Sequence, residues 1–303
     1  MILTVTMNAA LDVSYGVEHL SHGEPVRVRD VSMRGGGKGV NVAFVLTALG
    51  TDVVATGFAG GHRGALIRAA VAGAGVGDAF FPIATESRQT VVVTADDGAL
   101  AEYDEPGAPV SGMEWAGFLA AYRQLLAGSS AVVCAGSLPP GVPDTAYATL
   151  ISVAHDEGLT VALDSSGEAL RAGLGAKPDL LKVNRAEYES LAGGEPRAEA
   201  GVIELAERIG GTVVVTMGAE GAVAAGDGWR YRVRLPQRPG NPVGAGDAFT
   251  AALVCDDLAG ADPAERLAFA AALAASAVGM PCAGMVDLDV ARALVDRVEV
   301  EAL

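Results

Sequence analysis

From residue 113 to residue 216, segments with the hydrophobic spacing of helices alternate with short runs of strand-forming residues. The pattern predicts helices over 113–127, 144–157, 185–191 and 198–209, and strands over 131–135, 160–164, 180–183 and 212–216. Such alternation favours a largely parallel sheet covered by helices on both faces. In a sheet of this kind the carboxyl ends of the strands line one ligand crevice. The strands here end in polar residues that we expect to meet there: Ser137, Asp164, Asn184 with Glu187, and Thr216.

The remaining segments add strands outside this alternation. Residues 2–6 and 53–58 read as strands and 65–74 as a helix, whereas 13–33 has the pattern of short antiparallel strands and 88–103 that of a hairpin. Because the hairpin lies between two strand–helix units, we expect an added flap rather than part of the main sheet. Residues 264–278 and the tail from 288 onward are predicted helices. We expect one α/β domain over 1–303, with lid strands inserted at about 13–33 and 88–105.

The composition limits the class of protein. The 303 residues carry a net charge of −16, which disfavours nucleic acid or an anionic membrane as a partner because either would need a basic face. No run approaches 18 apolar residues and the first residues lack the pattern of a signal peptide, so we expect a cytoplasmic protein. Cys134, Cys255 and Cys282 are scattered, which argues against a disulfide framework or a zinc site.

Two glycine-rich loops point to the chemistry. Residues 34–44 read RGGGKGVNVAF and residues 241–249 read NPVGAGDAF, and each loop leads into a helical pattern. The free N–H groups at the start of a helix can hold an anion, and the glycines leave room for a phosphate. Lys38 adds positive charge to one loop, and Asp247 in the other could take a proton from a hydroxyl attacking the bound phosphorus. The alternatives are a structural glycine turn and an aspartate that merely favours a helix N-terminus.

Other residues add to this interpretation. Asp12 follows the strand at 2–6, where it could bind a ligand or simply form a turn, and Arg88 begins the hairpin, where it could reach a ligand. The chain has neither the GxxxxGK[ST] loop of one nucleotide-binding class nor the GxGxxG motif of nicotinamide dehydrogenases.

With both loops in place, the sequence resembles the PfkB branch of the ribokinase-like carbohydrate kinases. GGGKGVNVA and NPVGAGDAF match the two signature regions of that family, and GSLPPG (136–141), DSSGEAL (164–170), KVNRAE (182–187) and TMGAEG (216–221) match further family motifs. The resemblance covers essentially the whole chain. It implies a three-layer α/β/α sandwich with a mostly parallel central sheet and a small β-strand lid.

The resemblance also implies a role for each matched position. Asp247 would be the catalytic base, and the amides of Gly244, Ala245 and Gly246 would form an anion hole for the transferred phosphoryl group. ATP and Mg²⁺ are the implied cofactors: Asn184 and Glu187 would act on Mg²⁺ mostly through water, and the nucleotide would contact Lys182, Thr216, Gly218, Gly221 and Ser276. The sugar would contact Asp12, Gly37, Asn41 and Ser137. The lid would exclude water, and because lid strands often pair between subunits in the family, a homodimer is implied.

Three segments narrow the resemblance to the 1-phosphofructokinase and tagatose-6-phosphate kinase group: DEPG at 104–107, TGFAGGHRG at 56–64 and the NPVG form of the second loop. Such enzymes phosphorylate a ketohexose that is already phosphorylated. Arg27, Lys38 and Arg88 could neutralise the phosphate of that substrate. The group usually has TxNPAxD at the first strand end; here Ala9 replaces the proline, which frees the backbone before Asp12 and changes the expected support of the sugar.

These observations lead to one main hypothesis and two alternatives. The main hypothesis is an ATP-dependent kinase that converts a ketohexose phosphate to a bisphosphate, with fructose 1-phosphate as the first candidate acceptor and fructose 6-phosphate or tagatose 6-phosphate next. One alternative is a kinase of an unphosphorylated sugar or a nucleoside. The other is a sugar-phosphate or nucleotide sensor without catalysis, which would have no need of an acid beside an anion hole.

Overall fold

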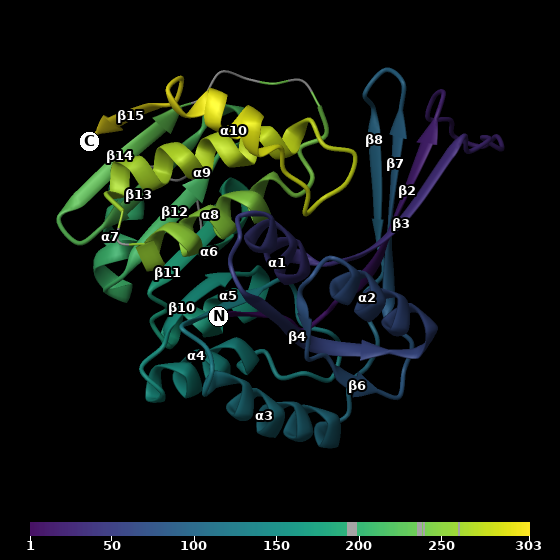
Figure 1. Cartoon of the computed structure of the whole chain (residues 1–303), viewed down its shortest axis with the longest axis horizontal. Coiled ribbons are helices and arrows are strands. Elements are labelled where there is room, and N and C mark those ends of the chain that lie inside the picture. The colour runs from purple at the N-terminus through teal and green to yellow at the C-terminus, as the bar shows by residue number, and fades with distance from the viewer. Residues whose placement is uncertain (193–198, 235–237, 239, 260) are drawn as a thin grey trace.

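The computed structural model describes residues 1–192, 199–234, 238, 240–259 and 261–303. Its main feature is an eleven-stranded sheet with the order β15-β14-β13-β12-β11-β10-β9-β1-β4-β5, in which β6 pairs with β4 (Figure 1). Its strands are β1 (Ile2–Thr6), β4 (Val53–Gly60), β5 (Gly77–Asp78), β6 (Phe81–Ile83), β9 (Ala131–Ala135), β10 (Thr160–Asp164), β11 (Leu180–Asn184), β12 (Thr212–Thr216), β13 (Ala222–Gly226), β14 (Trp229–Arg234) and β15 (Glu299–Ala302).

The sheet is parallel from β5 through β12 and antiparallel from β12 to β15. β1 lies between β4 and β9, so the chain begins in the interior of the sheet. Successive residues of its strands contact opposite layers: Ile2 packs in one core, whereas Leu3 and Val5 pack in the other. The parallel strands end at the same edge, which places their polar end residues together.

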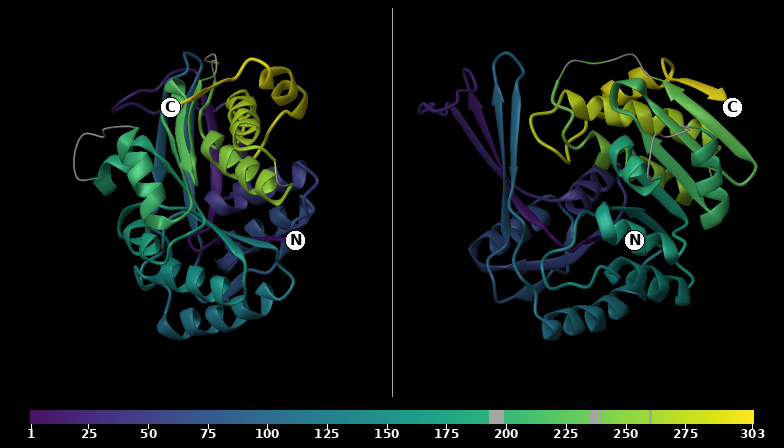
Figure 2. Two further views of the ribbon diagram at one scale, coloured as in Figure 1. Left: turned by 90° about the vertical axis from the view of Figure 1, so that its left-hand side faces the viewer. Right: turned by 180° about the vertical axis from the view of Figure 1, so that it is seen from behind.

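Helices cover both faces of the sheet, as the edge-on view in Figure 2 shows. One layer holds α1 (Lys38–Ala48), α2 (Gly61–Gly73), α8 (Ala245–Ala259), α9 (Pro263–Val278) and α10 (Leu288–Val295). The other holds α3 (Gly112–Leu126), α4 (Ala146–Asp156), α5 (Gly167–Gly175), α6 (Arg185–Ala192) and α7 (Ala200–Ile209). The expected three-layer α/β/α sandwich with a mostly parallel sheet is confirmed.

A separate four-stranded sheet stands beside the main body and has the order β3-β2-β7-β8 (Figure 1). It consists of β2 (Ala10–Val17), β3 (Asp30–Gly36), β7 (Arg88–Ala95) and β8 (Leu100–Asp104). Arg34, Asp12, Thr90 and Asp104 are direct partners across its strands, and all four line the large cleft of the molecule. Their face is called the inner face below. Because side chains alternate along a strand, Met33, Val13, Val91 and Tyr103 form the corresponding row on the outer face.

The structure corrects several sequence-based expectations. Asp12 does not close the strand at 2–6, because the chain turns at Met7 and Asn8 and Asp12 becomes the third residue of β2. Helix α5 was not predicted, and the tail is not one helix, since α10 ends at Val295 and β15 completes the sheet edge. The predicted start of a helix at residue 198 lies outside the described residues. Within the described part of the chain, none of the helices has the length and hydropathy needed to span a bilayer.

Candidate active site

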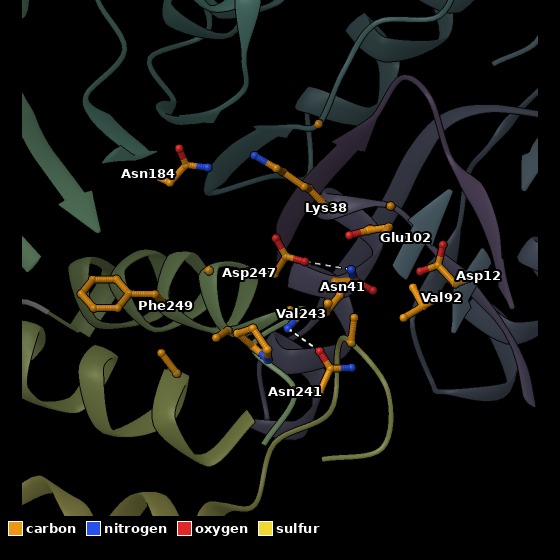
Figure 3. A pocket seen from close by; sticks show the side chains of 18 of the residues that line it. Asp12, Lys38, Asn41, Val92, Glu102, Asn184, Asn241, Val243, Asp247 and Phe249 are labelled. Carbon is orange, nitrogen blue, oxygen red and sulfur yellow. Dashed lines mark hydrogen bonds between the residues drawn. The ribbon is translucent and has the colours of Figure 1, made fainter. Parts of the chain in front are cut away.

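A cleft of about 1040 Å³ lies between the inner face of the small sheet and the carboxyl ends of the main sheet. It brings together predicted residues from both halves of the chain: Asp12, Gly37, Lys38, Asn41, Arg88, Ser137, Lys182, Asn184, Glu187, Thr216, Gly218, Gly221, Gly244, Ala245, Gly246 and Asp247 all line it. The two glycine loops, about 200 positions apart in the sequence, thus open into one cavity. Figure 3 shows Asp247 near its middle, with Asp12 and Glu102 to one side and Lys38 and Asn184 on another.

Two predicted residues lie elsewhere. Arg27 is exposed on the segment between β2 and β3 and is not among the residues that line the cleft. Ser276 is buried in α9, where its hydroxyl donates to the carbonyl of Leu273 and accepts from the amide of Asp287. Its neighbours Ala274 and Ala275 line the cleft in its place.

Asp247 occupies the first turn of α8 and is 7% exposed. Its Oδ2 accepts a hydrogen bond of 2.8 Å from Nδ2 of Asn41, which projects from α1 (Figure 3). Burial and the nearby carboxylate of Asp164 raise the pKa of Asp247 to about 6, although Lys182 opposes them. A carboxylate with a pKa in this range is suited to accept a proton near neutral pH.

The loop before Asp247 has a backbone that depends on glycine. Gly244 has φ 85°, a left-handed conformation, and a Cβ at this position would lie 2.8 Å from Cα of Ala283. The amide of Ala245 donates to the carbonyl of Pro242 at 3.1 Å, which closes a turn just before α8. A Cβ on Gly246 would lie 2.7 Å from Nζ of Lys182, so this ammonium group lies beside the backbone of the loop.

Asp164, at the end of β10, joins two lysines in a buried ion cluster. Its Oδ1 accepts from Lys38 at 2.7 Å, and its Oδ2 accepts from Lys182 at 2.9 Å and from the hydroxyl of Thr250 at 3.0 Å. Burial alone would raise the pKa of Asp164, but Lys182 and Lys38 outweigh it and the pKa is lowered. Lys38 also donates to Glu187 at 2.9 Å. Burial would lower the pKa of Lys38, yet the two carboxylates raise it, so the cluster keeps its charges.

Asn184 and Glu187 form a reciprocal pair at the start of α6. The backbone N–H of Asn184 donates to Oε2 of Glu187, and the backbone N–H of Glu187 donates to Oδ1 of Asn184, both at 2.8 Å. The pair holds the Glu187 carboxylate at the cleft wall. Among the described residues, no group of three His, Cys, Asp or Glu side chains is arranged to hold a metal ion. The oxygen atoms of Asn184 and Glu187 are of the kind that Mg²⁺ binds, directly or through water.

The side of the cleft facing the small sheet presents hydrogen-bonding groups suited to an alcohol. Burial raises the pKa of Asp12 to about 7. The positive charge of Arg88 lowers this pKa, whereas the negative charge of Asp247 raises it further. Asn41 is 6% exposed, and its Oδ1 has no hydrogen-bond partner although Nδ2 is engaged. A buried amide oxygen of this kind can accept a hydroxyl from a ligand. A Cβ on Gly36 would overlap the Asp12 carboxylate, so glycine at this position leaves room for that carboxylate.

Arg88 is fixed at the base of the small sheet. Its Nε donates to the carbonyl of Asn8 at 3.0 Å and its Nη1 contacts Asp104 at 3.1 Å. The side chain of Asn8 in turn donates to Ser137 and to the carbonyl of Pro106, at 3.1 and 3.2 Å. These bonds connect the small sheet to the strand ends of the main sheet.

The opposite end of the cleft is lined largely by small or apolar residues. Thr216, Gly218 and Gly221 line it from β12 and the segment after it, and Ala271, Ala274, Ala275 and Val278 line it from α9. A Cβ on Gly221 would overlap the carbonyl of Val233. A flat aromatic ring such as a nucleobase fits walls of this kind.

Sequence reasoning missed two features of the site. Asp164 was expected at the crevice as a polar strand end, but its two lysine contacts were not predicted, because they depend on the order of the strands and on the position of α1. Arg34 lines the cleft from β3, and its guanidinium lies 4.1 Å from the centre of the Phe44 ring. Its position directly before the first glycine loop was a signal that could have suggested it.

The sequence matches the pfkB family of carbohydrate kinases over residues 5–285. A 1-phosphofructokinase of Vibrio cholerae serotype O1 is 34% identical over 307 residues, which cover 100% of this chain and 97% of that protein. A possible 1-phosphofructokinase of Thermotoga maritima has a similar structure, with TM-score 0.91 and 27% identity over 100% of this chain and 99% of that one. The structure of phosphofructokinase-2 of Escherichia coli in complex with fructose-6-phosphate has a TM-score of 0.86 and 27% identity, over 97% of this chain and 98% of that one. The chain belongs to the pfkB family of carbohydrate kinases and is a sugar kinase.

Proposed function

We propose that this kinase transfers the γ-phosphoryl group of ATP to a ketohexose phosphate and releases a bisphosphate. Fructose 1-phosphate is the first candidate acceptor, followed by fructose 6-phosphate and tagatose 6-phosphate. The observation that carries the proposal is the position of Asp247: a buried carboxylate with a raised pKa, on the first turn of α8, between a glycine loop and the inner face of the small sheet. The 1-phosphofructokinase relative supports the choice of acceptor.

In the proposed reaction, Asp247 accepts the proton of the attacking hydroxyl while Asn41 holds the carboxylate in place. The amides of Gly244, Ala245 and Gly246 receive the charge on the transferred phosphoryl group; at Ala245 this bond replaces the turn bond to Pro242. Lys182, beside Gly246, adds positive charge at the same place. These groups work by position and electrostatics, which supply most of the catalysis of phosphoryl transfer.

The ends of the cleft would divide the two substrates. The nucleotide would lie against Thr216, Gly218 and Gly221, and Mg²⁺, which neutralises phosphate charge when bound, would be held through water by Asn184 and Glu187. The acceptor would lie under the small sheet. Asp12 and Asn41 would bind its hydroxyls, with Gly37 and Ser137 close by, and Arg88 its phosphate. Arg27 would reach such a phosphate only after the segment between β2 and β3 moves, since it is exposed here.

We further propose that the small sheet is the lid of a single kinase domain and that its outer face pairs two subunits. Val31, Met33 and Tyr103 on that face are 59%, 64% and 64% exposed, which is unusual for large apolar side chains grouped on one sheet. A tetrameric form is described for phosphofructokinase-2 of Escherichia coli. We place the reaction in the cytoplasm, where ATP and sugar phosphates are both available.

An ADP-release assay over fructose 1-phosphate, fructose 6-phosphate, tagatose 6-phosphate and free fructose tests the proposal. We expect kcat/KM to be highest for fructose 1-phosphate and lowest for free fructose. A higher kcat/KM for free fructose would instead support a kinase of unphosphorylated acceptors. ATP binding without turnover on any of them would support a sensor.

A further inference from the structure

Arg34 extends from the inner face of β3 to a segment about 250 positions later in the sequence. Its Nη1 donates to the carbonyl of Ala283 at 3.2 Å, and its Nη2 makes a longer contact of 3.5 Å with the carbonyl of Gly284. The guanidinium also lies 4.1 Å from the centre of the Phe44 ring. Arginine can stack on an aromatic ring and bond two oxygens at once, whereas the single ammonium of lysine cannot do both.

The segment that Arg34 binds, residues 281–284, packs tightly against two parts of the site. A Cβ on Gly244 would lie 2.8 Å from Cα of Ala283, so Ala283 supports the loop before Asp247. A Cβ on Gly284 would lie 3.1 Å from Oδ1 of Asn41, the residue that donates to Asp247. Because neither contact leaves room for an extra carbon, a shift of this segment changes the surroundings of both groups.

The small sheet touches this segment at a second position. The hydroxyl of Ser32 and Sγ of Cys282 are 3.7 Å apart. Ser32 and Arg34 both line the cleft from β3, two positions apart on the same face. One edge of the small sheet is therefore tied to the residues that support the catalytic loop.

We propose that Arg34 is a positioning residue that fastens residues 281–284 to the small sheet, so that the geometry of Gly244 and of the Asn41–Asp247 pair depends on where that sheet stands. The inference rests on the proposed function, in which that sheet covers the acceptor. A movement of the small sheet over an acceptor would then be transmitted to the catalytic loop through residues 281–284.

The test compares Arg34→Met with Arg34→Lys. Methionine keeps much of the length and the contact with Phe44 but removes the donors, whereas lysine keeps the charge and a single donor group, the ammonium. We expect Arg34→Met to lower kcat by about tenfold or more while KM for each substrate changes less than about threefold, the pattern of a group that acts on the transition state. Arg34→Lys should recover part of the loss. Amide hydrogen exchange in a peptide covering residues 279–287, measured without substrates, should be faster in Arg34→Met than in the wild type.

Arg29→Met is the matched control. Arg29 belongs to the same hairpin and pairs with Asp96, far from residues 281–284, so its removal changes the charge of the small sheet equally. It should leave kcat and the exchange of 279–287 near wild-type values. An unchanged exchange rate in Arg34→Met, an unchanged kcat, or a raised KM for the sugar phosphate at constant kcat would each overturn the proposal. Amide hydrogen exchange is measured without turnover. It therefore tests whether Arg34 holds residues 281–284 in place even if none of the sugars is phosphorylated and the proposed function fails.

Discussion

At the scale of single residues, the behaviour of Asp247 is set by what surrounds it. Burial and the Asp164 carboxylate favour the protonated acid, whereas Lys182, Lys38 and the bond from Asn41 favour the carboxylate. The balance puts the pKa at about 6 instead of the ordinary aspartate value of 3.8. At neutral pH the group is ionised, yet basic enough to accept a proton from a hydroxyl.

The rate should therefore depend on pH. Because the base works as a carboxylate, kcat should be constant above its pKa and fall tenfold per unit of pH below about 6. A profile of kcat from pH 5 to pH 8 at saturating substrates measures this. Asp12→Asn removes another carboxyl group of the cleft with a raised pKa and should keep the fall near pH 6. A kcat that stays constant down to pH 5 would contradict the assignment of Asp247 as the base.

Replacing the base should separate chemistry from binding. Asp247→Asn keeps the shape of the side chain but cannot accept the proton, so kcat should fall by about 10² to 10⁴-fold, the usual contribution of a general base. ATP affinity, measured by calorimetry, should stay within a factor of about three because the nucleotide end of the cleft is untouched. A variant as active as the wild type would remove Asp247 from the reaction.

Among the elements, sequence patterns found the long and strongly periodic ones. The parallel strands β9 to β12 and the helices α4, α6 and α7 were predicted because buried strands give continuous apolar runs and these helices have a regular hydrophobic spacing. Helix α5 was missed because its nine residues begin and end with glycine. Strand β15, with the sequence EVEA, is short and mostly exposed, and its pairing with β14 depends on a neighbour that local pattern does not reveal.

The candidate site was predictable where it depends on motifs and not where it depends on topology. Both glycine loops and Asp247 could be located from residue type and spacing alone. Asp164 contacts Lys182 because β10 and β11 are neighbours in the sheet. It contacts Lys38 because α1 begins at that residue, at the same cleft. The family resemblance suggested that Arg27 contacts the substrate. Arg27 lies on the segment between β2 and β3, and the hydrophobic pattern of the sequence does not predict the conformation of that segment.

The cluster that joins β10, β11 and α1 should also matter for stability. Asp164 is fully buried, so Asp164→Asn leaves the buried Lys182 and the partly exposed Lys38 facing a neutral side chain. Breaking a buried pair by removing one partner costs about 3 to 5 kcal/mol, and we expect a loss of that size in the free energy of unfolding in urea at pH 7. Asp289→Asn, which breaks the exposed pair with Arg292, should cost about 0.5 kcal/mol or less. A loss below about 1 kcal/mol for Asp164→Asn would mean that the cluster adds little to stability.

At the scale of the whole molecule, the cleft exists because two sheets meet. The main sheet supplies polar strand ends and helix starts, and the small sheet, which stands beside it (Figure 1), supplies a polar inner face to the cleft. Its outer face is apolar and contacts α2 near its base, whereas Val31, Met33 and Tyr103 remain exposed further along. A lid needs a polar inner face for its substrate, and the exposed outer residues are explained if a second subunit covers them.

Met33→Glu tests this pairing. A charge at the centre of an apolar interface stays unpaired when the surfaces meet, so we expect the variant to sediment as a monomer at concentrations where the wild type is a dimer. Met113→Glu is the matched control, because Met113 is 85% exposed on α3, on the main body, and the same change there should leave the dimer intact. Dissociation should also raise KM for the sugar phosphate more than KM for ATP, since the small sheet borders the acceptor end of the cleft. If Met33→Glu keeps the mass of a dimer, subunits do not pair through this face, and the lid must close over its substrate as part of a single chain.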